Sequence, residues 1–194
     1  EHIIYVSACR NNGEYKQSHW LFNVYSDENN VQINSTNFPD PVFREHITWY
    51  DTNNDGWFSD LELMKSNSTQ IVILGSDEAK LTSVEGIQHL ININDLILMG
   101  HPSTEIDISD ADHILYLTCN NNQLTSLNAE NGTLRKLYCY NNPLSELSVA
   151  DNPDLVDLDI NNTNIEELSV SSNTKLEKLN VDNTHLTSLD LSYN

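Results

Sequence analysis

The stretch from Ile93 to Leu191 carries one short pattern five times: Leu96-Ile97-Leu98, Leu117-Thr118-Cys119, Leu137-Tyr138-Cys139, Leu158-Asp159-Ile160 and Leu179-Asn180-Val181. The leading leucines are 21, 20, 21 and 21 residues apart, and an apolar residue precedes each of them by three positions. A second apolar pair follows in every copy, the first being Ile106 and Ile108. Five copies in one register indicate a repeat solenoid.

The alternating apolar residues of each copy predict a short strand with one buried face. A single strand of this kind cannot bury that face alone, so the units are expected to stack into a parallel sheet with strands ~4.8 Å apart. A polar residue follows each strand, where the turn leaves backbone groups unpaired. Asn122 and Asn142 offer two donors and an acceptor, whereas Thr163 and Thr184 offer only a hydroxyl, so the later turns are expected to be held less firmly.

Upstream of the repeats, residues 51–62 have the sequence Asp-Thr-Asn-Asn-Asp-Gly-Trp-Phe-Ser-Asp-Leu-Glu. This order matches the EF-hand calcium loop, which spaces oxygen ligands around a turn-forming glycine. The expected ligands are the side chains of Asp51, Asn53, Asp55 and Glu62, the backbone carbonyl of Trp57, and Ser59 through a water. A polar turn without a metal is the alternative. The sequence has no second loop of this kind, so a structural calcium ion is expected rather than a switch.

The segments around this loop complete the predicted cap. A helix is expected to begin at Pro41, with Asp40 as its N-cap and with Phe43, Ile47 and Tyr50 on one face. Strands are expected at residues 3–6 and 20–25, joined by a turn at 11–13, and the first solenoid strand is expected at 70–74. We therefore divide the chain into an N-terminal cap, residues 1–68, and a repeat array, residues 69–194.

The repeats resemble those of bacterial secreted or cell-surface leucine-rich repeat proteins of the internalin type, in units such as Leu124-Thr125-Ser126-Leu127. The helix and calcium loop are similar to the N-terminal cap of such proteins, and Cys119 with Cys139 resembles the cysteine ladder of some of them. The resemblance implies an α/β solenoid: a right-handed superhelix with a parallel concave sheet, preceded by a small β and helix-loop-helix cap. It also implies binding rather than catalysis. We expect both cysteines to be buried free thiols, because both side chains point into the core.

The net charge of the chain limits the classes of partner that it is expected to bind. The 194 residues include 29 acidic and 9 basic side chains, which gives a formal net charge of −20. Such a field repels nucleic acids and anionic lipids, and no apolar run approaches the ~20 residues of a membrane span. The first residues lack the features of a signal peptide, so we expect that a targeting segment was removed and that the chain is secreted or held at the cell surface.

The residues that alternate with the core leucines lie on the concave face of the sheet. Exposed tyrosine and methionine are typical of interfaces. The candidate partner-binding residues are Tyr116, Tyr138, Tyr140, Asp157, Asp159, Ile97 and Met99. An alternative for Ile97 and Met99, and for Val72 and Leu74 beside them, is that residues 1–37 cover them as ordinary core.

The sequence thus predicts an extracellular binding module whose partner is a protein, with a glycan as the variant. It contains no zinc-ligand spacing, no phosphate loop and no marked nucleophile–base pair, so no enzyme is predicted. Two alternatives remain: a structural spacer in a larger surface protein, and an accessory domain of a carbohydrate-active protein.

Overall fold

The structure is a computed structural model, and it describes residues 4–9, 15–20, 30–59, 62, 69–75 and 80–194, with side chains from residue 30 onward. The predicted turn at 11–13, the side chain of Cys9 and most of the predicted helix after the calcium loop lie outside the described residues.

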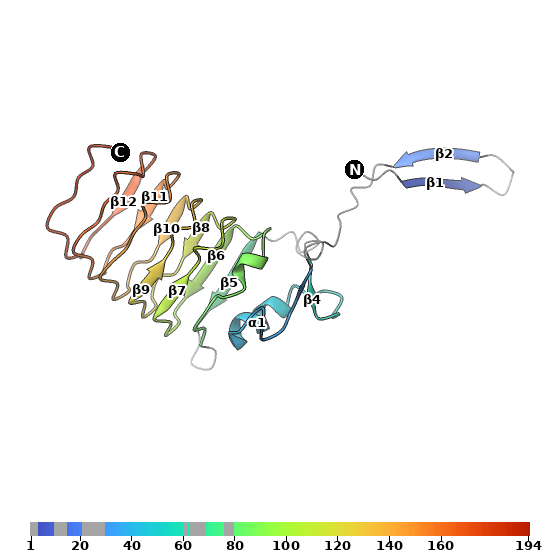
Figure 1. Ribbon diagram of the computed structural model, residues 1–194, viewed down its shortest axis with the longest axis horizontal. Coiled ribbons are helices and arrows are strands. Elements are labelled where there is room, and N and C mark those ends of the chain that lie inside the picture. The colour runs from blue at the N-terminus through green and yellow to red at the C-terminus, as the bar shows by residue number, and fades with distance from the viewer. Residues whose placement is uncertain (1–3, 10–14, 21–29, 60–61, 63–68, 76–79) are drawn as a thin grey trace.

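Six parallel strands form the concave sheet of a solenoid (Figure 1). They are β5 (Gln70–Leu74), β6 (Asp95–Met99), β8 (Tyr116–Thr118), β10 (Lys136–Tyr138), β11 (Asp157–Asp159) and β12 (Lys178–Asn180). Each strand pairs with the strand of the next repeat. The leading leucines are aligned across the sheet, since Leu117 pairs with Leu96 on one side and with Leu137 on the other. The predicted α/β leucine-rich repeat solenoid with a parallel sheet is confirmed.

A second, smaller sheet lies on the opposite side of the core. It consists of two parallel strands, β7 (Glu105–Asp107) and β9 (Ser126–Asn128), which contain Ile106 and Leu127, the leading residues of the first two copies of the second apolar pair. Leu147 holds the same place in the next coil, but residues 145–149 form no strand there. Between β5 and β6 the chain makes a short 3₁₀ helix, η1 (Ile87–His89).

One hydrophobic core runs from Phe38 in the cap to Val170 in the array. Cys119 and Cys139 lie within this core, and each is a fully buried free thiol, as expected from the sequence. Burial raises the pKa of the Cys139 thiol to about 12, so the thiol stays protonated and behaves as a small apolar side chain.

One carboxylate makes hydrogen bonds to both the cap and the array. Helix α1 (Pro41–Thr48) begins as predicted, because Oδ1 of Asp40 accepts hydrogen bonds from the backbone N–H groups of Val42 and Phe43, at 2.8 and 2.9 Å. The second oxygen, Oδ2, accepts from the hydroxyl of Thr82 at 2.7 Å and from its N–H at 2.8 Å. A single side chain therefore caps the helix and binds the first coil of the array.

The N-terminal segment contains an antiparallel pair of strands. Strand β1 (Ile4–Cys9) pairs antiparallel with β2 (Tyr15–Trp20), and Cys9 lies opposite Tyr15. Strand β2 was not predicted from the sequence, and of the predicted strand at 20–25 only Trp20 belongs to the described residues. Trp20 is the last residue of β2, where it faces Ile4.

Candidate functional site

The predicted calcium loop is closed by its own carboxylates. Asp51 accepts hydrogen bonds from the backbone N–H groups of Asp55 at 3.1 Å and Gly56 at 2.9 Å. Gly56 has a φ of 80°, in the left-handed region that glycine adopts without strain. The side chain of Asp51, the first expected ligand, is thereby bonded to the turn in the middle of the loop.

The last ligand position also reaches back across the loop. Glu62 is 2% exposed, and its Oε1 accepts from the N–H of Thr52 at 2.8 Å. Its Oε2 accepts from the N–H and the hydroxyl of Ser59, at 3.1 and 3.0 Å. Glu62, at loop position 12, therefore contacts the residues at positions 2 and 9.

The second half of the loop pairs with another part of the cap. Strand β4 (Trp57–Phe58) is antiparallel to β3 (Val31–Gln32), and Ile33 donates from its N–H to the carbonyl of Gly56 at 2.9 Å. The strand in this loop therefore pairs with another strand of the same cap. Over the part of the chain that the structure describes, no three His, Cys, Asp or Glu side chains are gathered as a ready-made metal site.

On the concave face, Tyr138 is fixed by Asp157. The hydroxyl of Tyr138 donates to Oδ2 of Asp157 at 2.7 Å, and Nζ of Lys178 lies 3.9 Å from the same oxygen. Asp157 is only 8% exposed, so it supports the tyrosine rather than forming an open polar flank. Asp159, beside it, accepts hydrogen bonds from the side-chain amides of Asn161 and Asn180.

The other predicted concave residues differ in how firmly they are held. Nζ of Lys136 lies 5.7 Å from the ring centre of Tyr116, a cation–π contact. Tyr140 is half-buried, and within the described residues its hydroxyl has no hydrogen-bond partner. Ile97 and Met99 are also half-buried. Within the described residues, the cluster thus combines two tyrosines that make polar contacts with one whose hydroxyl makes none.

The apolar residues at the first strand stay open to solvent. Val72 and Leu74 are 40% and 60% exposed. Most of the segment 1–37, which the alternative places over them, lies outside the residues whose side chains are described. With Ile97 and Met99 they extend the tyrosine cluster towards the cap.

Tyr138 should titrate later than an ordinary tyrosine. The hydrogen bond to Asp157, together with burial and the charges of Asp157 and Asp159, raises its pKa from 10.0 to about 12. The unfolded chain releases this proton first, so the stabilising contribution is complete below pH 10 and is lost as the pH rises towards about 12. Tyrosinate absorbance should show one late step that Tyr138→Phe removes and Asp157→Asn moves towards lower pH. An unchanged titration in Asp157→Asn would contradict the hydrogen bond.

The predicted turn asparagines hold the coils together. The amide of Asn142 donates to the carbonyls of Cys119 and Cys139, at 3.0 and 2.8 Å, and its oxygen accepts from the N–H of Leu124 at 3.0 Å. Asn122 does the same one coil earlier, whereas the hydroxyl of Thr163 makes a single bond to Ile160. This is the difference in the number of bonds that the sequence predicts.

Two further asparagine series were missed. An outer ladder, at positions 121, 141, 162 and 183, has left-handed φ values of 53° to 58°, and the last three amides each donate to the side-chain oxygen of the preceding asparagine. An inner ladder, at positions 131, 152, 173 and 194, donates to backbone carbonyls of the preceding coil. Their recurrence every 20 or 21 residues was the available signal.

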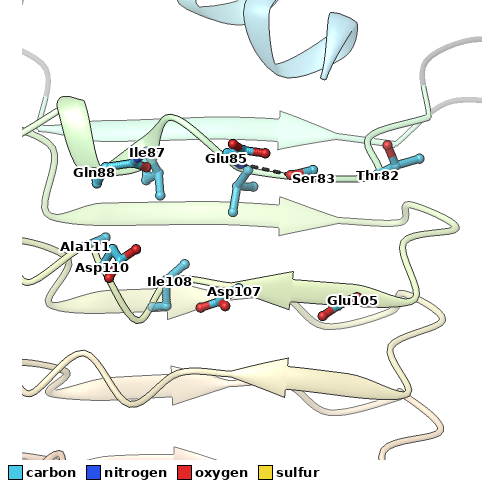
Figure 2. A pocket seen from close by; sticks show the side chains of 11 residues that line it. Thr82, Ser83, Glu85, Ile87, Gln88, Glu105, Asp107, Ile108, Asp110 and Ala111 are labelled. Carbon is cyan, nitrogen blue, oxygen red and sulfur yellow. Dashed lines mark hydrogen bonds between the residues drawn. The ribbon is translucent and has the colours of Figure 1, made fainter. Parts of the chain in front are cut away.

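A shallow hollow of about 390 Å³ lies on the opposite side from the tyrosines, between the first two coils (Figure 2). The carboxylates of Glu85, Glu105, Asp107 and Asp110 line it. None of the residues predicted to bind a partner belongs to it.

The sequence matches no family model and no curated protein. Among solved structures, the fold is similar to that of an internalin, InlF, from Listeria monocytogenes, at 26% identity over 82% of this chain and 52% of that chain, with a TM-score of 0.60. YopM from Yersinia enterocolitica matches at 19% identity over 76% of this chain and 34% of its own, with a TM-score of 0.52. The functional domain of InlJ from Listeria monocytogenes matches at 22% identity over 85% and 45% of the two chains, with a TM-score of 0.42.

The chain spans about half the length of the internalin InlF that it matches. The similarity supports a leucine-rich repeat solenoid of the bacterial type. Among the described residues, no helix is long and apolar enough to cross a membrane.

Proposed function

We propose that this chain, built like the internalin that it resembles, is a binding module for a protein partner, is secreted or held at the cell surface, and carries a structural calcium ion in its cap. Its partner is proposed to dock on the concave face at Tyr116, Tyr138 and Tyr140. The role proposed is binding rather than catalysis.

The observation that carries this proposal is the fixed position of Tyr138. A tyrosine whose hydroxyl is bonded to a buried carboxylate loses little conformational freedom on binding, so its ring offers contact area at low entropic cost. Tyr116, held beneath Lys136, is pre-positioned in the same way. Aromatic side chains in such a setting are the usual centre of a protein interface.

Replacing Tyr138 and Tyr140 by alanine tests the proposal. Each single substitution is expected to cost at least ~2 kcal/mol of binding free energy, because tyrosines near the centre of an interface carry most of the affinity. The immobilised wild-type and double-mutant chains would be compared for the extracellular proteins that they capture, and captured partners would be titrated. Tyr193→Ala is the matched control, since Tyr193 is 63% exposed and lies outside the cluster.

Capture that survives in the double mutant would move the site off this face. If neither chain captures a protein but both retain a glycan, the carbohydrate alternative would gain support. A spacer, by contrast, should bind nothing through these tyrosines.

Calcium is proposed for the loop at 51–62. Asp51, Asn53, Asp55 and Glu62 would hold the ion through side-chain oxygens, Trp57 through its carbonyl and Ser59 through a water. When bound, the ion would supply positive charge to carboxylates that otherwise rely on loop N–H groups. The closed geometry of Glu62 and the β3–β4 pairing support this proposal, because both ends of the loop are already close together.

A further inference from the structure

Asn120 is the one described side chain whose amide nitrogen and oxygen are both buried without a hydrogen-bond partner. The residue is 1% exposed. Its neighbours in the sequence are different: Asn121 and Asn122 both use their side chains in the ladders and turns. A buried amide with neither atom bonded costs free energy that the fold does not recover, so its presence calls for an explanation.

Asn120 lies inside the tyrosine cluster. Leu117 and Cys119 point into the core, so alternation along the strand places Asn120 on the concave side. The bonds from Cys119 to Tyr138 and from Asn121 to Tyr140 continue the parallel register past the end of β8. Tyr140 is therefore the neighbour of Asn120 in the next coil.

The two tyrosines of the next coil differ in whether their hydroxyl groups are hydrogen-bonded, and this difference affects access to Asn120. Tyr138 is bonded to Asp157 and stays in place, whereas the hydroxyl of Tyr140 has no partner within the described chain. Turning Tyr140 aside breaks no hydrogen bond of its side chain. Access to the amide of Asn120 past Tyr140 would leave the bond between Tyr138 and Asp157 in place.

We infer that Asn120 recognises the main chain of an extended peptide segment of the partner. A carboxamide presents a donor and an acceptor side by side, and in an extended strand the N–H and C=O of one residue point the same way. One peptide residue therefore satisfies both orphaned atoms at once. A lone carboxylate or ammonium group satisfies only one. A nucleobase also pairs with a carboxamide, but the net charge of −20 repels a polynucleotide.

This inference rests on the proposed function, since it names what the concave face recognises. The test uses a displayed library of linear peptides, selected on the wild-type chain. Selected peptides should bind Asn120→Leu at least tenfold more weakly, about the change that ~1.4 kcal/mol produces. Binding should fall likewise in Tyr138→Ala. Thr118→Val, a substitution of similar size on the same face of the same coil, should leave binding unchanged.

The unbound chains provide a second readout. Asn120→Leu should unfold at a higher denaturant concentration than the wild type, because it removes a buried amide that nothing satisfies. A lower midpoint would mean that Asn120 supports the fold, and the inference would be overturned.

The binding outcomes separate the inference from the proposed function. Peptides that lose affinity for Tyr138→Ala but not for Asn120→Leu overturn the inference and leave the concave site standing. Peptides indifferent to both variants overturn both. Selection that yields no peptide overturns an extended peptide as the ligand, while capture of a folded partner would still test the concave site.

Discussion

Asn142→Ala is expected to lower the free energy of unfolding by about 2 to 6 kcal/mol. The substitution leaves the N–H of Leu124 and the carbonyl of Cys139 buried without their side-chain partner, at ~1–3 kcal/mol for each group. The carbonyl of Cys119 loses one of its two amide donors and keeps the other, from Asn122. Denaturant unfolding followed by circular dichroism would measure the difference.

Thr163→Val is the matched control in the following coil. It preserves the shape of the side chain and removes one hydrogen bond, to the carbonyl of Ile160, so it should cost only ~1–3 kcal/mol. The order of the two effects is the decisive result. If Thr163→Val destabilises the chain as much as Asn142→Ala, the number of turn bonds does not determine how firmly the coils are held.

Removing calcium is expected to lower the thermal unfolding midpoint. An ion that binds only the folded cap stabilises it by ~2.7 kcal/mol when its concentration is a hundred times the dissociation constant. The effect should extend into the array, because Tyr50, which precedes the loop, donates from its hydroxyl to the carbonyl of Gln70 in β5. Calorimetry with added calcium and then with chelator would record both midpoints.

Asp51→Ala and Glu62→Ala should abolish the response to calcium. Glu62 also accepts hydrogen bonds from the loop itself, so its loss lowers stability even without the ion, and the informative quantity is the shift between calcium and chelator. Glu146→Ala, at an exposed carboxylate in the array, should retain the full shift. A midpoint that calcium leaves unmoved in the wild type would mean that the loop is only a turn.

The fold was predictable from the sequence because its elements repeat. A register error in one strand would have placed Leu96, Leu117 and Leu137 on different faces, and five copies leave a single consistent alignment. The helix start was equally clear, since Asp40 followed by Pro41 is a strong local signal. The N-terminal strand pair lacked such support, and β2 at residues 15–20 was not predicted from the sequence.

The candidate site was predictable only as a set of positions on one face. Alternation placed Tyr138 and Asp157 on the concave side, but it did not show that one would hold the other. Nor did it show that Asn120 would be enclosed, because burial on an open sheet depends on the rotamers of its neighbours. The interactions between side chains of adjacent coils could therefore be identified only from the structure.

The asparagine ladders also determine where the array tolerates a change of length. One repeat has 20 residues between its leading leucines where the others have 21, and the missing position lies at Glu130, just before the inner-ladder residue Asn131. The outer ladder spans this shorter repeat and the next with the same amide-to-oxygen distance, 2.7 Å. The connection at Glu130 thus accommodates the shorter repeat while the ladder distance stays the same. Inserted peptides grafted there would be carried on the outside of the coil, while the tyrosine face on the opposite side keeps its spacing.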